Sequence, residues 1–561
     1  MVESVHEICD RYVDEAAAAD PVLATMFGLP GHDDALTDYS PAGHAVRAEL
    51  ARKALRAIQS AEPTDDSERV AKAVFIERIG LEVEIHDAGL PLTSLNVIES
   101  PVQNIRMVFD VMPTDTAADW TVIARRLAGV PEALAGVRAS LLVGVRRGQI
   151  CALRQVVKVA EQADTWAGSA GKEGFFSTFV AAAEELDGAP LTDLRQGALA
   201  AERAYAELAD FLRSELVPIA PVTDAVGEQT YRLWSRYFTG ADLDLQEAYA
   251  WGWAEFARLE AEMAAIADRI APGASLSETA TLLDADPKYT LTGQDELRDW
   301  MQQTSDQALE SLRDKHFEIP DELMTLECTI APPGGVVGAY YIGPSADFSR
   351  PGRMTWSVEQ GKQDFQTWRE ASTVYHEGVP GHHLQIATAV READSLNKYQ
   401  RMMSFTSGHG EGWALYAERL MQELGYLTED GDLFGMLAQQ LFRAARVIVD
   451  IGMHLEWEIP AGNDFHAGER WTPDLGLEFL LTRTLVDETT ARDEIDRYLG
   501  WPGQAPAYKL GERMWLTARE EARERAGAAF DVKDFHTRAL RLGGMGLDTL
   551  REQLAAPHPR L

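Results

Sequence analysis

The chain has 561 residues, 46% of them hydrophobic and 25% charged, which is typical of globular proteins and long enough for several domains or one large enzyme. Asp and Glu outnumber Lys and Arg by 89 to 52, so the formal net charge is −37. Affinity for nucleic acids and for anionic membranes comes from basic side chains, so this excess of acid argues against both as partners. The simplest explanation of the charge is solubility.

The cysteine content and the N-terminal sequence both bear on location. Cys9, Cys151 and Cys328 lie far apart and form neither a disulfide framework nor a cysteine zinc site. The first 20 residues carry acids where a signal peptide would need a basic and then an apolar segment. The longest uncharged stretch, 328–346, contains prolines and glycines, which argues against a membrane-spanning helix. We therefore expect a soluble, cytoplasmic protein.

Hydrophobic periodicity predicts a mostly α-helical protein. Apolar residues recur at three- and four-residue spacing, for example over 194–216 and 245–270. Proline and glycine cluster at 271–293, where Thr292 has the character of a helix N-cap. We place a boundary there, which gives an N-terminal helical lobe over 1–290 and a C-terminal lobe over 291–561, unless the two form one continuous domain.

One region has strand character instead. Residues 323–330 alternate apolar and polar side chains, and 336–342 and 353–358 are rich in β-branched and aromatic residues. With turn chemistry at PPGG (332–335), this predicts a small sheet over about 323–358. Many zinc peptidases bind an extended substrate along a sheet edge, so Tyr340 and Tyr341 are candidates for substrate binding. A purely structural sheet is the alternative.

The histidines are clustered. Four of the 13, His376, His382, His383 and His409, fall within 34 residues, where an even spread would place about one. An amphipathic helix is predicted to run into His376. In the motif H-E-x-x-H, two histidines four positions apart bind zinc and the glutamate acts as a base. Here Pro380 occupies the fourth position and cannot bind a metal.

A continuous helix would keep the later histidines away from His376. His382 would lie about 120° around the helix and His383 about 10.5 Å along it. Because zinc bonds are about 2.0–2.1 Å long, neither could then share a metal ion with His376. A break at 380–381 could bring either one back. The alternative is ordinary histidines beside a proline–glycine kink; we expect a metal centre, with Glu377 as its base.

Two further residues are candidates for this site. Glu411, in the segment 408–424, lies opposite the main apolar stripe of its predicted helix, and Gly410 and Gly412 beside it would allow close backbone approach. A partly buried carboxylate needs a partner such as a metal, although a solvated acid at a helix N-terminus is the alternative. Tyr508 is a possible donor to a developing oxyanion, or else a core tyrosine.

Together these motifs resemble the family of unknown function numbered 885, whose motif is HE-x-x-PGHH. The resemblance covers most of the chain and rests on seven segments: FGLPGHDDALTDYS (27–40), ESPVQNIRMVFD (99–110), YYIGPSADFSRPG (340–352), HEGVPGHHLQ (376–385), EGWALYAE (411–418), RYLGWPGQAPAYKLG (497–511) and FDVKDFHTRALRLGGMGL (530–547). That family is similar to the helical gluzincin peptidases, whose zinc is held by two histidines and one glutamate. The resemblance implies a two-lobed, helical, metallopeptidase-like fold with the small sheet beside the active-site cleft.

The resemblance also implies roles for individual residues. The zinc ligands would be His376, His382 and Glu411, with Glu377 as the base. In the family the position of His383 can hold other residue types, which favours His382 as the ligand.

Residues for substrate binding come from the same segments. His383 and Gln504 lie in the shared motifs and are assigned to substrate binding. Arg350 and Arg497 are assigned to it as well, since either could clamp a terminal carboxylate, with structural ion pairs as the alternative.

These features predict a zinc-dependent metallohydrolase with one zinc ion per chain and a metal-bound water. We expect it to be a peptidase of the carboxypeptidase, dipeptidase or oligopeptidase type, acting on a small peptide or amide, with Glu377 and Tyr508 as the catalytic residues. One alternative is an amidase that acts on a non-peptide amide. Another is a catalytically inactive binding protein with the same fold. The oligomeric state is left open.

Overall fold

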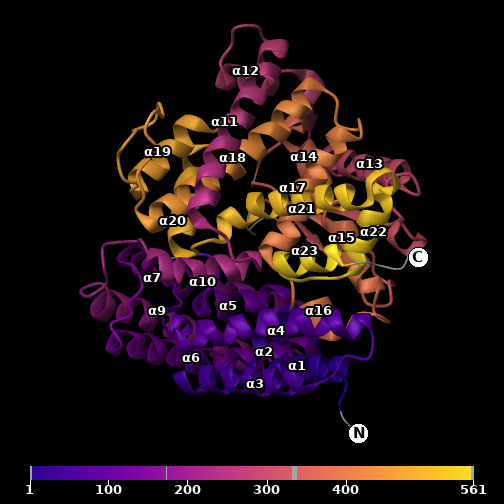
Figure 1. Cartoon of the computed structure of the whole chain (residues 1–561). Coiled ribbons are helices and arrows are strands. Elements are labelled where there is room, and N and C mark those ends of the chain that lie inside the picture. The colour runs from indigo at the N-terminus through magenta and orange to yellow at the C-terminus, as the bar shows by residue number, and fades with distance from the viewer. Residues whose placement is uncertain (1–2, 172, 332–337, 360, 557–561) are drawn as a thin grey trace. The chain divides into compact units, whose positions relative to one another are not determined.

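The computed structural model describes residues 3–171, 173–331, 338–359 and 361–556, and it is mostly helical, as the sequence predicts (Figure 1). Contacts between Cα atoms divide the chain into two compact units. The first comprises Met1–Pro63, Ile79–Gly227 and Arg492–Pro502, and the second comprises Thr64–Arg78, Glu228–Ala491 and Gly503–Leu561. The boundary expected at 290–291 falls inside the second unit.

The first unit contains helices and connecting segments, with no strand among its described residues. Its helices are α1 Val5–Ala19, α2 Pro21–Met26, α3 Pro41–Ser60, the end of α4 Asp66–Asp87, α5 Pro101–Met107, α6 Ala117–Arg146, α7 Leu153–Ala167, α8 Phe175–Ala181, α9 Leu191–Phe211 and most of α20 Glu488–Gly500. The expected helix over 194–216 is α9 followed by a π-helical turn, Leu212–Leu216.

Helix α6 is the one described helix that is long and apolar enough to cross a membrane. It packs against α9, and its Trp120 and Leu127 belong to the core of the first unit. Its Arg126 is fully buried and donates hydrogen bonds to the carbonyl oxygens of His32 and Ala35. These contacts are those of a core helix.

The second unit contains the remaining helices and the strands. Its helices are α10 Gly227–Thr239, α11 Leu245–Ile270, α12 Leu276–Asp284, α13 Gln294–Leu312, α14 Thr367–Glu377, α15 His382–Arg391, α16 Lys398–Met402, α17 Ser407–Glu423, α18 Asp430–Leu455, α19 Pro473–Arg483, α21 Gln504–Ala526, α22 Val532–Arg541 and α23 Leu547–Ala555. The helix expected over 245–270 is confirmed as α11. Helix α18 packs against α11, α14 and α21 (Figure 1), which explains why α11 belongs to this unit and not to an N-terminal lobe.

The predicted sheet is present with shorter strands. Strands β2 Leu326–Ile330, β4 Gly352–Ser357 and β3 Gly338–Ile342 lie in that order; β2 is parallel to β4, and β3 is antiparallel to β4. The expected turn at 332–335 and the first two residues of the expected strand 336–342 lie outside the described residues.

A second pair of strands was not predicted. Strands β1 Thr290–Thr292 and β5 Asp364–Gln366 are antiparallel, with Thr292 opposite Asp364. The prediction of Thr292 as a helix N-cap is therefore wrong, because Thr292 is the last residue of β1 and pairs with β5. The N-cap of α13 is Gly293, with a φ of 92°.

Helices α17 and α21 lie side by side in the second unit and cross closely (Figure 1). A Cβ atom on Gly412 would overlap the backbone of Gly511, so the glycine permits this approach, as the sequence predicts. Larger residues at such a crossing force the helices apart.

We expect Gly412→Ala to lower the free energy of unfolding by about 1–3 kcal/mol, because the added methyl group has no space. Gly80→Ala is the control, since Gly80 lies within α4 with no atom near its missing Cβ and should gain up to about 1 kcal/mol. Urea denaturation followed by circular dichroism measures both. Equal stabilities of the two variants would contradict the close crossing.

Candidate metal centre

The proline–glycine step breaks the helix that carries the first histidine. Helix α14 ends at Glu377 and α15 begins at His382, with a cis peptide bond between Val379 and Pro380 in the intervening segment. The N–H of Gly381 donates to the carbonyl oxygen of Tyr375 at 3.0 Å. The chain therefore turns back on the end of α14 within four residues, as the break expected from the sequence requires.

Two residues hold this break in place. A Cβ atom on Gly381 would overlap the carbonyl oxygen of His376, so only glycine fits there. The fully buried Trp413 of α17 donates from Nε1 to the carbonyl oxygens of Pro380 (3.0 Å) and Gly381 (3.1 Å). Because buried carbonyls without partners are costly, Trp413 stabilises a backbone conformation that the helix itself cannot.

The break brings His376 and His382 together. Their ring centroids lie 5.0 Å apart with the planes at 89°. The Oε2 atom of Glu411 lies 3.2 Å from Nε2 of His376 and 3.7 Å from Nε2 of His382. In a tetrahedral zinc site with bonds of about 2.0–2.1 Å, ligand atoms are about 3.3 Å apart. The spacing and the donor types, two imidazoles and one carboxylate, both fit zinc.

A second carboxylate lies beside this group. One oxygen of the buried Glu377 and one nitrogen each of His376 and His382 all lie within 4.8 Å of one another. Glu411 lies 3.2 Å and 3.7 Å from nitrogens of the same two histidines, so both carboxylates adjoin the imidazole pair. The group therefore offers two imidazoles and two carboxylates, enough for a metal ligand and a separate base.

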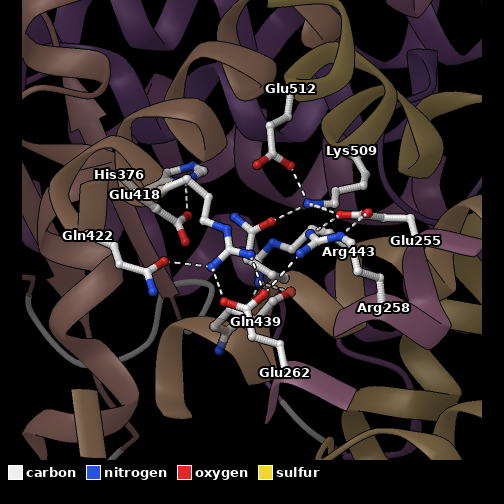
Figure 2. A network of polar contacts seen from close by, with 12 residues as sticks. Glu255, Arg258, Glu262, His376, Glu418, Gln422, Gln439, Arg443, Lys509 and Glu512 are labelled. Carbon is white, nitrogen blue, oxygen red and sulfur yellow. Dashed lines mark hydrogen bonds and ion pairs between the residues drawn. The ribbon is translucent and has the colours of Figure 1, made fainter. Parts of the chain in front are cut away.

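Glu418 is a site residue that the sequence reasoning missed. Its Oε1 lies 2.8 Å from Nδ1 of His376, and Figure 2 shows these two side chains facing one another. Since Nε2 of His376 faces Glu411, both ring nitrogens of His376 face carboxylates of α17. Glu411 and Glu418 are seven residues apart, two helical turns, and therefore share a face. That spacing was the available signal. A carboxylate on the far nitrogen of a metal-binding histidine fixes its tautomer and orientation.

Electrostatics at this group favour a cation. Burial alone would lower the pKa of His376, but its hydrogen bonds to Glu411 and Glu418 raise it to about 10. Burial would raise the pKa of Glu411, yet the hydrogen bonds from His376 and His382 hold it well below its usual range. The carboxylate is therefore ionised and the site attracts positive charge, whether a proton or a metal ion.

His383 is turned away from the metal group. Its Nε2 donates to the carbonyl oxygen of Leu323 at 2.8 Å, so its Nδ1 accepts from the hydroxyl of Tyr341 at 3.0 Å. Burial lowers the pKa of His383 to about 4, so the ring is neutral. With both nitrogens engaged, His383 has none left for a metal. By contrast, Nδ1 of His382 is buried with no hydrogen-bond partner among the described residues.

The predicted substrate-binding residues are spread more widely. Tyr340 is 43% exposed on β3. Tyr508 is half-buried on α21, with the guanidinium of Arg446 4.9 Å from its ring centroid. Gln504 is buried one helical turn before it.

The two predicted arginines have local contacts of their own. Arg350 is exposed and donates to the carbonyl oxygen of Pro351. Arg497 belongs to the first unit, where it pairs with Glu494 at 2.9 Å. The structural ion pair weighed as the alternative for Arg497 is thus present.

Comparison with protein families identifies the chain. The model described as "Bacterial protein of unknown function (DUF885)" matches residues 21–554. The chain belongs to the DUF885 family. Among curated proteins none matches this DUF885 chain.

Two solved structures share the fold of this DUF885 protein. One is described as the "putative lipoprotein" from Colwellia psychrerythraea, with 20% identity, a TM-score of 0.83 and 98% of each chain covered. The other is described as a "putative lipoprotein of unknown function" from Shewanella oneidensis, with 16% identity, a TM-score of 0.75, and 99% of this chain and 100% of that chain covered. At these identities the likeness extends to the fold alone.

We expect His382→Ala to weaken zinc binding by more than 100-fold and His383→Ala by less than 10-fold. The reason is that Nε2 of His382 faces Glu411, whereas both nitrogens of His383 are engaged elsewhere. Competition with a chromogenic chelator measures both affinities. Equal losses, or the reverse order, would contradict the choice of ligand.

We expect Glu418→Gln to weaken zinc binding by about 10–100-fold, the usual effect of losing a hydrogen-bonding partner of a ligand. Glu423→Gln is the matched control, because Glu423 lies on the same helix but is exposed and pairs with Arg519 at 2.9 Å. It should bind zinc as the wild type does. Identical affinities for the two variants would remove Glu418 from the site.

Proposed function

We propose that this DUF885 protein is a zinc-dependent metallohydrolase that cleaves small peptides. The observation that carries the proposal is the set formed by His376, His382 and Glu411, with its zinc-like spacing. A zinc ion bound there would supply Lewis-acid activation for amide hydrolysis. The set comes from three helices, with His376 near the end of α14, His382 at the start of α15 and Glu411 on α17. Two histidines and a glutamate from a later helix support the kinship with gluzincin peptidases that the sequence suggests.

Glu377 is the proposed general base. It is buried, and one of its oxygens lies within 4.8 Å of a nitrogen of each histidine. In this proposal Glu411 takes the ligand position and Glu377 acts on the water. In this role its carboxylate accepts a proton from the attacking water and passes it to the leaving amine. General-base catalysis of this kind contributes about 10²–10⁴-fold to a rate.

Tyr508 and the β3 strand are the proposed contacts for substrate. The half-buried hydroxyl of Tyr508 would donate to the oxygen that gains charge during attack. Among the described strands β3 pairs with β4 alone, so its outer edge can accept an extended peptide. The hydrogen bond from Tyr341 to His383 ties this strand to the residue after His382. A peptide added to β3 would thus run past the metal group.

The cytoplasmic location expected from the sequence stays a proposal. Both structural neighbours are described as lipoproteins, which would not be cytoplasmic. Fractionation of bacterial cells that produce the protein separates the two possibilities.

A substrate panel tests the activity. Zinc-loaded protein is incubated with short peptides, acylated amines and cyclic amides, and the products are identified by mass spectrometry. Cleavage of peptides is the expected result. Cleavage of the other amides alone would make the protein an amidase, and zinc binding without any cleavage would make it a binding protein.

We expect Glu377→Gln to keep zinc and to lose peptide hydrolysis by at least about 10²-fold, since the amide cannot accept a proton at neutral pH. Glu411→Gln should weaken zinc binding first and regain part of its activity with excess zinc. Metal content and initial rates are measured on the same preparations. Near-full activity of Glu377→Gln, or equal loss of metal from both variants, would contradict the assigned roles.

A further inference from the structure

Helix α18 carries an unusual group of polar side chains through the core of the second unit. It packs against α11, α14 and α21, yet Gln440 and Arg446 are buried on it and Arg443 is half-buried. Arginine is rarely buried unless it is paired, because removing its charge from water is costly. The groups that these side chains contact therefore show whether each buried charge is compensated.

Arg443 lacks the partner that a buried guanidinium needs. It donates to the side-chain and backbone oxygens of Gln439 on its own helix, and its buried Nε has no hydrogen-bond partner among the described residues. No carboxylate of the described residues lies within 4.0 Å of it. Figure 2 shows the contrast: Arg258 pairs with Glu255 at 2.7 Å, and Lys509 pairs with Glu512, whereas Arg443 contacts Gln439.

Arg443 nevertheless lies in the electrostatic field of the metal group. Burial and the neighbouring Arg446 lower the pKa of its guanidinium. Glu418, Tyr508 and Glu411 attract its charge. Two of these are the carboxylates that flank His376, and the third is the proposed oxyanion donor. The geometry agrees: Arg443 precedes Arg446 by about one helical turn, the Arg446 guanidinium lies 4.9 Å from the Tyr508 ring centroid, and α18 packs against both α14 and α21. Arg443 thus lies on the Tyr508 side of α18, with its Nε left without a partner among the described residues.

The leftover donors match a carboxylate. Guanidinium groups bind carboxylates bidentately, with two parallel hydrogen bonds. In a peptide cleaved before its last residue, the terminal carboxylate lies about one residue, roughly 3.5 Å of chain, beyond the scissile carbonyl. A group that binds it must therefore lie close to the metal group.

We propose that Arg443 binds the free terminal carboxylate of the substrate, which makes the substrates peptides cleaved at their C-terminal residue. This rests on the proposed hydrolase function and narrows it to the carboxypeptidase or dipeptidase type. Arg446, stacked over Tyr508 at 4.9 Å, adds positive charge on the same side. Arg443 is a substrate-binding residue in this account and takes no part in the proton transfers.

Two peptide pools test the proposal. Each contains blocked dipeptides with all twenty C-terminal residues, one pool as free acids and the other as C-terminal amides. Zinc-loaded wild-type protein should cleave the acids at least about 30-fold faster than the amides, the effect expected when one member of a close charge pair is removed. Equal cleavage of both pools overturns the role of Arg443 and leaves the hydrolase intact. No cleavage of either pool overturns the proposed substrate class, and the substrate panel described above then decides whether the protein is a hydrolase.

Protein variants and a binding measurement separate recognition of the terminal carboxylate from catalysis. Arg443→Gln should abolish the preference for acids, Arg443→Lys should restore part of it, and Arg258→Gln, an arginine with its own carboxylate partners, should leave it unchanged. In equilibrium dialysis, the Glu377→Gln protein should retain the acid pool more than the amide pool. The Glu377→Gln, Arg443→Gln double variant should retain both pools equally. A preference that survives Arg443→Gln, or equal retention by Glu377→Gln, overturns the proposal.

Discussion

The imidazole of His376 is held between two carboxylates of a single helix, and the rest of the site depends on this arrangement. Glu411 faces one ring nitrogen at 3.2 Å and Glu418 the other at 2.8 Å. Because both acids come from α17, the orientation of His376 is fixed by how α14 packs on α17. A histidine fixed in this way presents Nε2 toward Glu411 and His382, and the second carboxylate makes that nitrogen a stronger donor to a metal.

Helix α17 also holds the break that brings His382 back. Its Trp413 donates to the carbonyl oxygens of Pro380 and Gly381 within that break. Its Gly412 admits α21, the helix that carries Tyr508. Helix α17 therefore supplies four things: the ligand Glu411, the orienting carboxylate Glu418, the Trp413 side chain that supports the break, and the Gly412 position that lets α21 approach. Small changes in its position would alter all four together.

Sequence patterns predicted the elements that depend on local chemistry. The helical spacing of apolar residues predicted α11, and the alternation of apolar and polar residues over 323–330 predicted β2; both elements are present. The choice between His382 and His383 depended on ring orientations set by Leu323 and Tyr341, which are distant in sequence. Arg443 was missed because only the packing of α18 reveals that its charge has no carboxylate partner. The placement of α11 likewise follows from its contacts with α18.

The central claim is that His376, His382 and Glu411 together hold a zinc ion. Elemental analysis of protein that has been loaded with zinc and then desalted tests it most directly. The account predicts about one zinc ion per chain in the wild type and close to none in His376→Ala, because that variant removes the imidazole held between Glu411 and Glu418. Wild-type protein without zinc, or a His376→Ala variant with undiminished zinc, would contradict it.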